Sequence, residues 1–139
     1  YEKYSEEFTK KFANSIKILS KNAQQNNIIL AIENSSNLGK HYIQDTLDKA
    51  LTYPNIKLTW DTGHDAVSGF KDQEYLLKKQ DYIAHMHLHD AKGYNDHQAL
   101  FDGELDINKL LGFAQSKNIR VLIEVKTKEA LVKSINRLS

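Results

Sequence analysis

The chain has 139 residues, of which 40% are apolar and 27% charged, and this composition is typical of one ordinary soluble globular domain. Nineteen basic and eighteen acidic side chains leave a formal net charge of +1, which lacks the positive excess typical of a dedicated nucleic-acid binder. The absence of cysteine excludes disulfides and thiolate chemistry, and no apolar run approaches the roughly 18 residues that a membrane span needs, so we expect a cytoplasmic protein.

The first predicted element is an amphipathic helix over residues 5–25. Its apolar side chains recur every three or four residues, at Phe8, Phe12, Ile16, Leu19 and Ala23. The apolar run from Ile28 to Ile32 comes next, is rich in β-branched residues and is bounded by polar ones. This pattern predicts a strand that is buried on both faces, as strands of a parallel sheet are.

Strands and helices alternate along the rest of the chain. Further strands are predicted at 56–61, 82–90 and 120–125, and helices at 40–52, 72–80, 106–117 and 127–139. Asp106 is a good N-cap for the third of these helices. One helix followed by four strand–helix units indicates parallel βαβ units, and hence a single α/β domain over residues 1–139.

Each predicted strand ends on a side chain that can bind a metal ion. The first, second and fourth strands end at Glu33, Asp61 and Glu124, and the third ends at His87 or His89. Functional residues collect at the carboxyl ends of parallel strands, so these side chains are expected to share one centre. Any one of them alone would be read as a cap or a solvated residue. All four lie in or just after apolar runs, however, where a bare charge is costly.

The donor set also narrows the choice of ion. Carboxylate oxygens together with an imidazole suit Mn²⁺, Zn²⁺, Mg²⁺ or Co²⁺, so we expect one divalent metal ion.

Four stretches of the sequence together resemble the xylose isomerase-like TIM-barrel superfamily, which includes sugar-phosphate isomerases and epimerases and endonuclease IV. They are LAIEN (30–34), LTWDTGHDAVSG (58–69), MHLHDAK with the following NDH and DGELD (86–106), and VLIEV (121–125). The resemblance implies a (β/α)8 barrel, a fold of about 250 residues. The chain would supply roughly its second half, namely one helix and four βα units. Half a barrel leaves two open sheet edges, so we expect a homo-oligomer that covers them.

The resemblance also implies residue roles. One divalent ion would be held by Glu33, Asp61, His87 and Glu124, with Glu33 and Glu124 as the catalytic carboxylates that remove and return a proton. His64, in the DTGH stretch, matches a histidine that contacts the substrate in the isomerases and binds an additional metal in endonuclease IV.

The remaining histidines of the HMHLHD and NDH stretches receive separate assignments. Alternation places His89 one pleat beyond His87, where it is expected to line the mouth and bind substrate, and places His85 deeper, as a hydrogen-bonded core residue. His97 matches a further metal ligand of the endonuclease and is expected here to bind substrate. The endonuclease has an Asp two residues earlier; here that position is Asn95, next to Asp96, and an amide is a poor zinc ligand.

Two loops carry further expectations. Gly63 is expected to allow the tight turn that points His64 back to the centre. Phe101 stands where the family often has a Gly, while Gly103 is kept, which predicts a differently shaped loop.

The resemblance implies a divalent-metal-dependent isomerase or epimerase of a sugar or sugar phosphate, which works through a metal-stabilised enediolate. Lys92 is read as solvated rather than as a contact for an anionic substrate. Gly93 stands where a ketose 3-epimerase would carry an Arg six residues after His87, which argues against that activity. Two alternatives stay open: an apurinic/apyrimidinic endonuclease with several zinc ions, and a non-catalytic barrel fragment. The piece alone is expected to have little activity.

Overall fold

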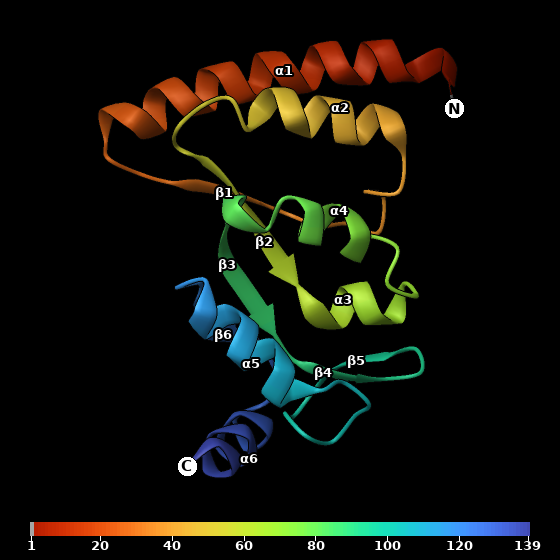
Figure 1. The fold of residues 1–139 in the computed structure, drawn as a ribbon, viewed down its shortest axis with the longest axis vertical. Helices are drawn as coiled ribbons and strands as arrows, with labels where there is room; N and C mark the ends of the chain where they lie inside the picture. The colour runs from red at the N-terminus through yellow and green to blue at the C-terminus, as the bar shows by residue number, and fades with distance from the viewer. Residues whose placement is uncertain (1) are drawn as a thin grey trace.

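The computed structural model describes residues 2–139, with side chains from residue 4 onward (Figure 1). The elements in chain order are α1 (Glu2–Gln25), β1 (Leu30–Glu33), α2 (His41–Ala50), β2 (Ile56–Asp61), α3 (Thr62–Val67), α4 (Gln73–Lys78), the short 3-10 helix η1 (Gln80–Tyr82), β3 (Ile83–Leu88), β4 (Asp90–Lys92), β5 (Asn95–Gln98), α5 (Ile107–Ser116), β6 (Arg120–Ile123) and α6 (Lys128–Leu138). No helix among these residues is long and apolar enough to cross a membrane.

Strands β1, β2, β3 and β6 form one parallel sheet in that order. Helices connect them, so the chain has the α/β architecture of four TIM-barrel units and the expected fold class is confirmed. Within the described residues, β1 pairs only with β2 and β6 pairs only with β3. These two strands are therefore the edges of the sheet.

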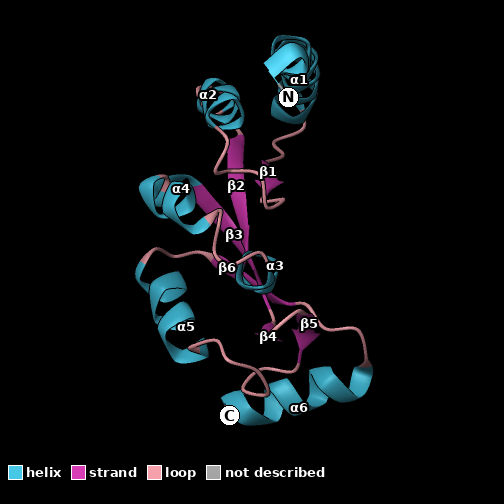
Figure 2. Cartoon of the chain, turned by 90° about the vertical axis from the view of Figure 1, so that its right-hand side faces the viewer, coloured by secondary structure: helices cyan, strands magenta, loops and turns pink. Residues whose placement is uncertain are grey.

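The core lies on one face of the sheet, the face that the helices cover, which is called the outer face here; the opposite face is the inner face. Alternate strand residues point to opposite faces, and the outer set is fully or almost fully buried, at Ile56, Leu58, Trp60, Met86 and Leu88. Helices α2, α4 and α5 cover this face, and Figure 2 shows them on one side of the strands. Trp60 packs edge-on against Phe113 of α5, with 5.6 Å between ring centroids.

The inner face of the sheet is covered by no helix within residues 2–139, as Figure 2 shows. Leu122 on this face is 48% exposed, and burial alternates along β1 so that Ala31 and Glu33 are exposed. The prediction that the first strand is buried on both faces is therefore wrong. Its bounds also shift, because Ile28 and Ile29 precede the strand and are more than half exposed.

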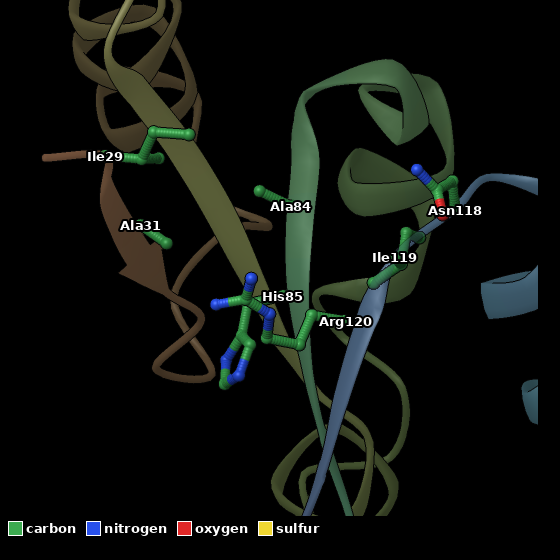
Figure 3. A pocket seen from close by; sticks show the side chains of 7 residues that line it. All are labelled: Ile29, Ala31, Ala84, His85, Asn118, Ile119 and Arg120. Atoms are coloured by element: carbon green, nitrogen blue, oxygen red, sulfur yellow. The ribbon is translucent and has the colours of Figure 1, made fainter. Parts of the chain in front are cut away.

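A hollow of about 530 Å³ lies on the inner face near the amino ends of the strands (Figure 3). His85 lines it beside Arg120, its register partner on β6. Burial, together with the neighbouring His87 and Arg120, holds the pKa of His85 below its ordinary value. His85 is only partly buried, so the expectation of a core histidine is wrong. The reason is that its face of the sheet is open.

A short helix and a hairpin near the site were not predicted. Helix α3 begins directly after β2 because the Asp61 side chain accepts a hydrogen bond from the His64 N–H and caps the helix. Strands β4 and β5 form a hairpin around Gly93, whose φ of 57° places it in the left-handed region. Both elements lie at the carboxyl end of the sheet and shape the candidate site.

Candidate metal centre

The four predicted ligands meet at the carboxyl ends of the strands. Glu33 and Asp61 are the last residues of β1 and β2, His87 pairs with Asp61 in the sheet register, and Glu124 directly follows β6. His87 Nδ1 lies 2.8 Å from Glu124 Oε2, 3.7 Å from Glu33 Oε2 and 3.8 Å from Asp61 Oδ2. The structure therefore brings all four side chains around one point.

Three atoms of this group are buried without a hydrogen-bond partner: Asp61 Oδ2, His87 Nδ1 and Glu124 Oε2. One ligand atom from each of these three residues lies within 4.8 Å of the other two. His87 Nδ1 and Glu124 Oε2 are close, but their angles do not meet hydrogen-bond geometry. Ligands about 2.1 Å from a common ion are separated by about 3.0 to 3.4 Å, depending on geometry. The observed separations of 2.8 to 3.8 Å bracket that range, so the donor set fits a divalent cation.

Asp61 is the most enclosed of the four, with no exposed surface. Its Oδ1 accepts hydrogen bonds from the His64 N–H at 2.7 Å and from His89 Nε2 at 3.0 Å. Although burial acts to raise it, these hydrogen bonds hold the pKa of Asp61 below its ordinary value. Asp61 is therefore ionised at neutral pH, as a metal ligand must be.

His64 lies on the rim of this group. Its Nδ1 is 3.2 Å from Asp61 Oδ2 and 3.8 Å from Glu33 Oε1, while its Nε2 is 3.5 Å from Asp96 Oδ2. About a third of the His64 side chain is exposed, so it borders both the cluster and solvent.

The β4–β5 hairpin brings His97 over the same site. His97 Nε2 lies 3.7 Å from Glu124 Oε1, and Nδ1 lies 2.8 Å from Asp96 Oδ1. Nitrogens of His64, His89 and His97 also lie within 4.8 Å of one another. Asp96 faces both His64 and His97, so a carboxylate is present near these histidines although position 95 is an amide.

His89 is not at the mouth, where alternation placed it. The side chain is completely buried, Nε2 contacts Asp61 Oδ1, and Nδ1 accepts a 2.8 Å hydrogen bond from the His97 N–H. Gly63 lies against the ring, and a Cβ at this position would overlap His89 Cε1 and Nδ1. Gly63 is not among the residues with positive φ, so the expected reason for this glycine, a special turn, is wrong.

Asn34 is a site residue that the sequence analysis did not single out. Its Oδ1 accepts the Asp61 N–H at 2.7 Å, and its Nδ2 donates to the Asp61 carbonyl at 3.3 Å. The side chain thereby extends the β1–β2 ladder one step beyond Glu33, which fixes the backbones of two predicted ligands relative to each other. The sequence does carry a sign of this role, because Asn34 is a polar residue directly after the strand, at the end of LAIEN.

Buried carboxylates also organise the loops around the site. Asp72 accepts the N–H groups of Ser36 and Leu38 at 2.6 and 2.7 Å, and Asp65 accepts the N–H of Asp72 at 3.1 Å. Burial raises the pKa of Asp65 to about 6. These contacts attach the loop that follows Glu33 to the segment before α4.

The loop after the hairpin is organised in the same way by Asp90, which accepts the N–H groups of Gly103 and Leu105. Phe101 has a φ of 68°, the left-handed conformation that a glycine adopts readily. Phe101 therefore takes up a conformation suited to the glycine expected there, at some cost in strain. Lys92 is exposed, as expected.

Comparisons with known proteins agree with this fold. A family model described as xylose isomerase-like TIM barrel matches residues 1–138. The crystal structure of 3-keto-D-glucoside 4-epimerase, YcjR, from E. coli superimposes with a TM-score of 0.64 at 16% identity, covering 91% of this chain and 50% of that chain. At this identity the likeness concerns the fold alone.

A sequence relative, the uncharacterized protein MJ1614 of Methanocaldococcus jannaschii, is 32% identical over 74 residues. The match covers 52% of this chain and 29% of that protein. The chain thus spans about half the length of the epimerase, and its match spans less than a third of the archaeal relative.

Proposed function

Because the chain belongs to the xylose isomerase-like TIM barrel family, we propose that it carries the metal-binding half of an isomerase or epimerase that acts on a sugar or sugar phosphate. The observation that carries this proposal is the convergence of the unpartnered atoms of Asp61, His87 and Glu124, with Glu33 beside them. An unpaired buried polar atom is costly, and three that point to one place favour a ligand that satisfies all of them.

In this proposal Glu33, Asp61, His87 and Glu124 hold one divalent ion, which is Mn²⁺, Zn²⁺, Mg²⁺ or Co²⁺. When bound, the ion would supply Lewis-acid polarisation of a substrate carbonyl, which makes the neighbouring C–H acidic.

Glu33 and Glu124 are the proposed acid–base pair. Each directs Oε2 toward His87, and each keeps Oε1 directed elsewhere, toward His64 in one case and toward His97 in the other. The side chains are 40% and 37% exposed, so both are accessible to a substrate. One Oε1 takes the proton from the carbon next to the carbonyl, and the other, on the opposite side of His87, returns a proton. His64 and His97 orient substrate hydroxyl groups by hydrogen bonds.

A second candidate is phosphodiester cleavage by several metal ions, as in the endonuclease branch. The cluster of His64, His89 and His97 nitrogens, with Asp96 nearby, supports it. The net charge of +1 counts against a DNA-binding role. A third candidate is a binding or structural barrel piece without turnover. Metal analysis separates the three: one ion favours the isomerase, several zinc ions favour the nuclease, and none favours the third.

The ligand assignment is tested with Asp61→Asn, which removes the charge and keeps the shape. Calorimetric titration with Mn²⁺ and Zn²⁺ should show high-affinity binding to the wild type and none to the variant. Asp81→Asn is the matched control, because Asp81 is 81% exposed and its ion pair is with Lys117, away from the site. Equal affinities of Asp61→Asn and wild type would reject Asp61 as a ligand.

A further inference from the structure

His89 has an unusual position for a histidine next to a metal-ligand cluster, because its ring is completely enclosed. The His89 ring stacks on the His97 ring, with 4.1 Å between centroids and 7° between planes. It also lies directly against Gly63. Both ring nitrogens are engaged within the protein, Nε2 with Asp61 and Nδ1 with the His97 N–H. A substrate contact is therefore not open to this side chain.

The hydrogen bonds determine which nitrogen of His89 carries the proton. The His97 backbone N–H is a donor, so Nδ1 must be the bare acceptor nitrogen. The proton of the neutral ring is then on Nε2, which donates to Asp61 Oδ1 at 3.0 Å. A flipped ring would lose both bonds, so the orientation is fixed from two directions.

The orientation of His89 in turn fixes the Asp61 carboxylate. Its Oδ1 receives two donors, the His64 N–H and His89 Nε2, while Oδ2 receives none and lies among the candidate ligands. Two donors on one oxygen hold the carboxylate against rotation about its Cβ–Cγ bond. The unpartnered Oδ2, which lies 3.8 Å from His87 Nδ1, is thereby aimed at the space between the candidate ligands.

Gly63 belongs to the same arrangement. A methyl group on it would overlap ring atoms Cε1 and Nδ1 of His89 and lie 2.8 Å from Nε2, closer than side chains approach. The backbone of Gly63 is not in the left-handed region. A side chain is excluded at this position because the His89 ring occupies the space that it would need. Any side chain at position 63 must displace the His89 ring.

We propose that His89 is a positioning residue for the metal centre: seated against Gly63, it holds Asp61 in the rotamer that presents Oδ2 to the ion. This inference rests on the metal site proposed above. Outer hydrogen bonds to a metal ligand typically matter roughly 10- to 100-fold in metal affinity, which sets the expected size of the effect.

The experiment is a Co²⁺ titration followed by the d–d absorption spectrum, applied to Gly63→Ala, His89→Ala and the double variant. Each single variant should weaken Co²⁺ binding roughly 10- to 100-fold and change the spectrum. In the His89→Ala background, Gly63→Ala should have no further effect, because the ring it strikes is gone. Gly112→Ala is the matched control, since a Cβ there meets nothing within 4 Å. His89→Gln, whose amide N–H2 can reach Asp61 Oδ1, should restore part of the affinity.

Wild-type affinity and spectrum in Gly63→Ala or His89→Ala would overturn the positioning role while leaving the metal site standing. Failure of the wild type to bind Co²⁺ would overturn both. A second measurement needs no variant: long-range ¹H–¹⁵N NMR of the wild type should show the His89 proton on Nε2. A proton on Nδ1 alone would contradict the inference whatever the metal does.

Discussion

Adding a divalent cation should raise the melting temperature, because the ion satisfies three buried atoms that have no partner in its absence. A ligand present at 100 times its dissociation constant stabilises the folded state by about 2.7 kcal/mol. For 139 residues the unfolding entropy is about 0.3 kcal/mol/K. Dividing the first by the second gives an expected increase of about 9 °C.

The assay is differential scanning calorimetry with and without Mn²⁺, after treatment with a chelator. Glu124→Gln removes the charge that lies 2.8 Å from His87 Nδ1 and should lose most of the increase. Lys133→Gln, on the exposed surface of α6, should keep it. An increase of the same size in Glu124→Gln would mean that the ion binds elsewhere, and no increase in the wild type would refute the reasoning from unpartnered atoms.

Two further predictions concern stability and assembly. Burial acts to raise the pKa of Asp48, but hydrogen bonds from Lys79 and Tyr75 hold it below its ordinary value. The stabilising contribution of Asp48 is therefore present above about pH 4. It is lost as the pH falls through the lowered pKa of the folded state. Asp48→Asn should therefore cost about 1 kcal/mol at pH 7 in urea denaturation and progressively less in acid; a pH-independent difference would contradict this. Sedimentation velocity should show a dimer or larger species, because β1 and β6 are unpaired edges within the described residues and Leu122, on the inner face of β6, is half exposed; a stable monomer would count against a homo-oligomer.

The α/β order and the meeting of strand ends were predictable because they depend on apolar periodicity and on parallel topology. Helix α3 was not, because its six residues TGHDAV have no apolar repeat and its start depends on a cap made by Asp61. The β4–β5 hairpin was missed because its second strand, Asn95–Gln98, is short and polar.

The position of His89 shows where extrapolation from a strand fails. Alternation places His85, His87 and His89 on one face, but β3 ends at Leu88 and the chain enters the hairpin at Asp90. Beyond Leu88 the two-residue period no longer determines direction, so His89 turns inward instead of lining the mouth. Only tertiary contacts, with Gly63 and Asp61, determine its place.

The tether between Asp72 and the loop after Glu33 has a consequence for recognition. Ser36 sits at a φ of 59°, a conformation that a free loop would seldom visit, and Asp72 holds it there through the Ser36 N–H. Folding therefore already orders the loop that follows Glu33. Binding of the proposed ion would then cost less conformational entropy at Glu33. Asp72 would thereby contribute to the ion affinity of the proposed metal site, although it is not among the proposed ligands.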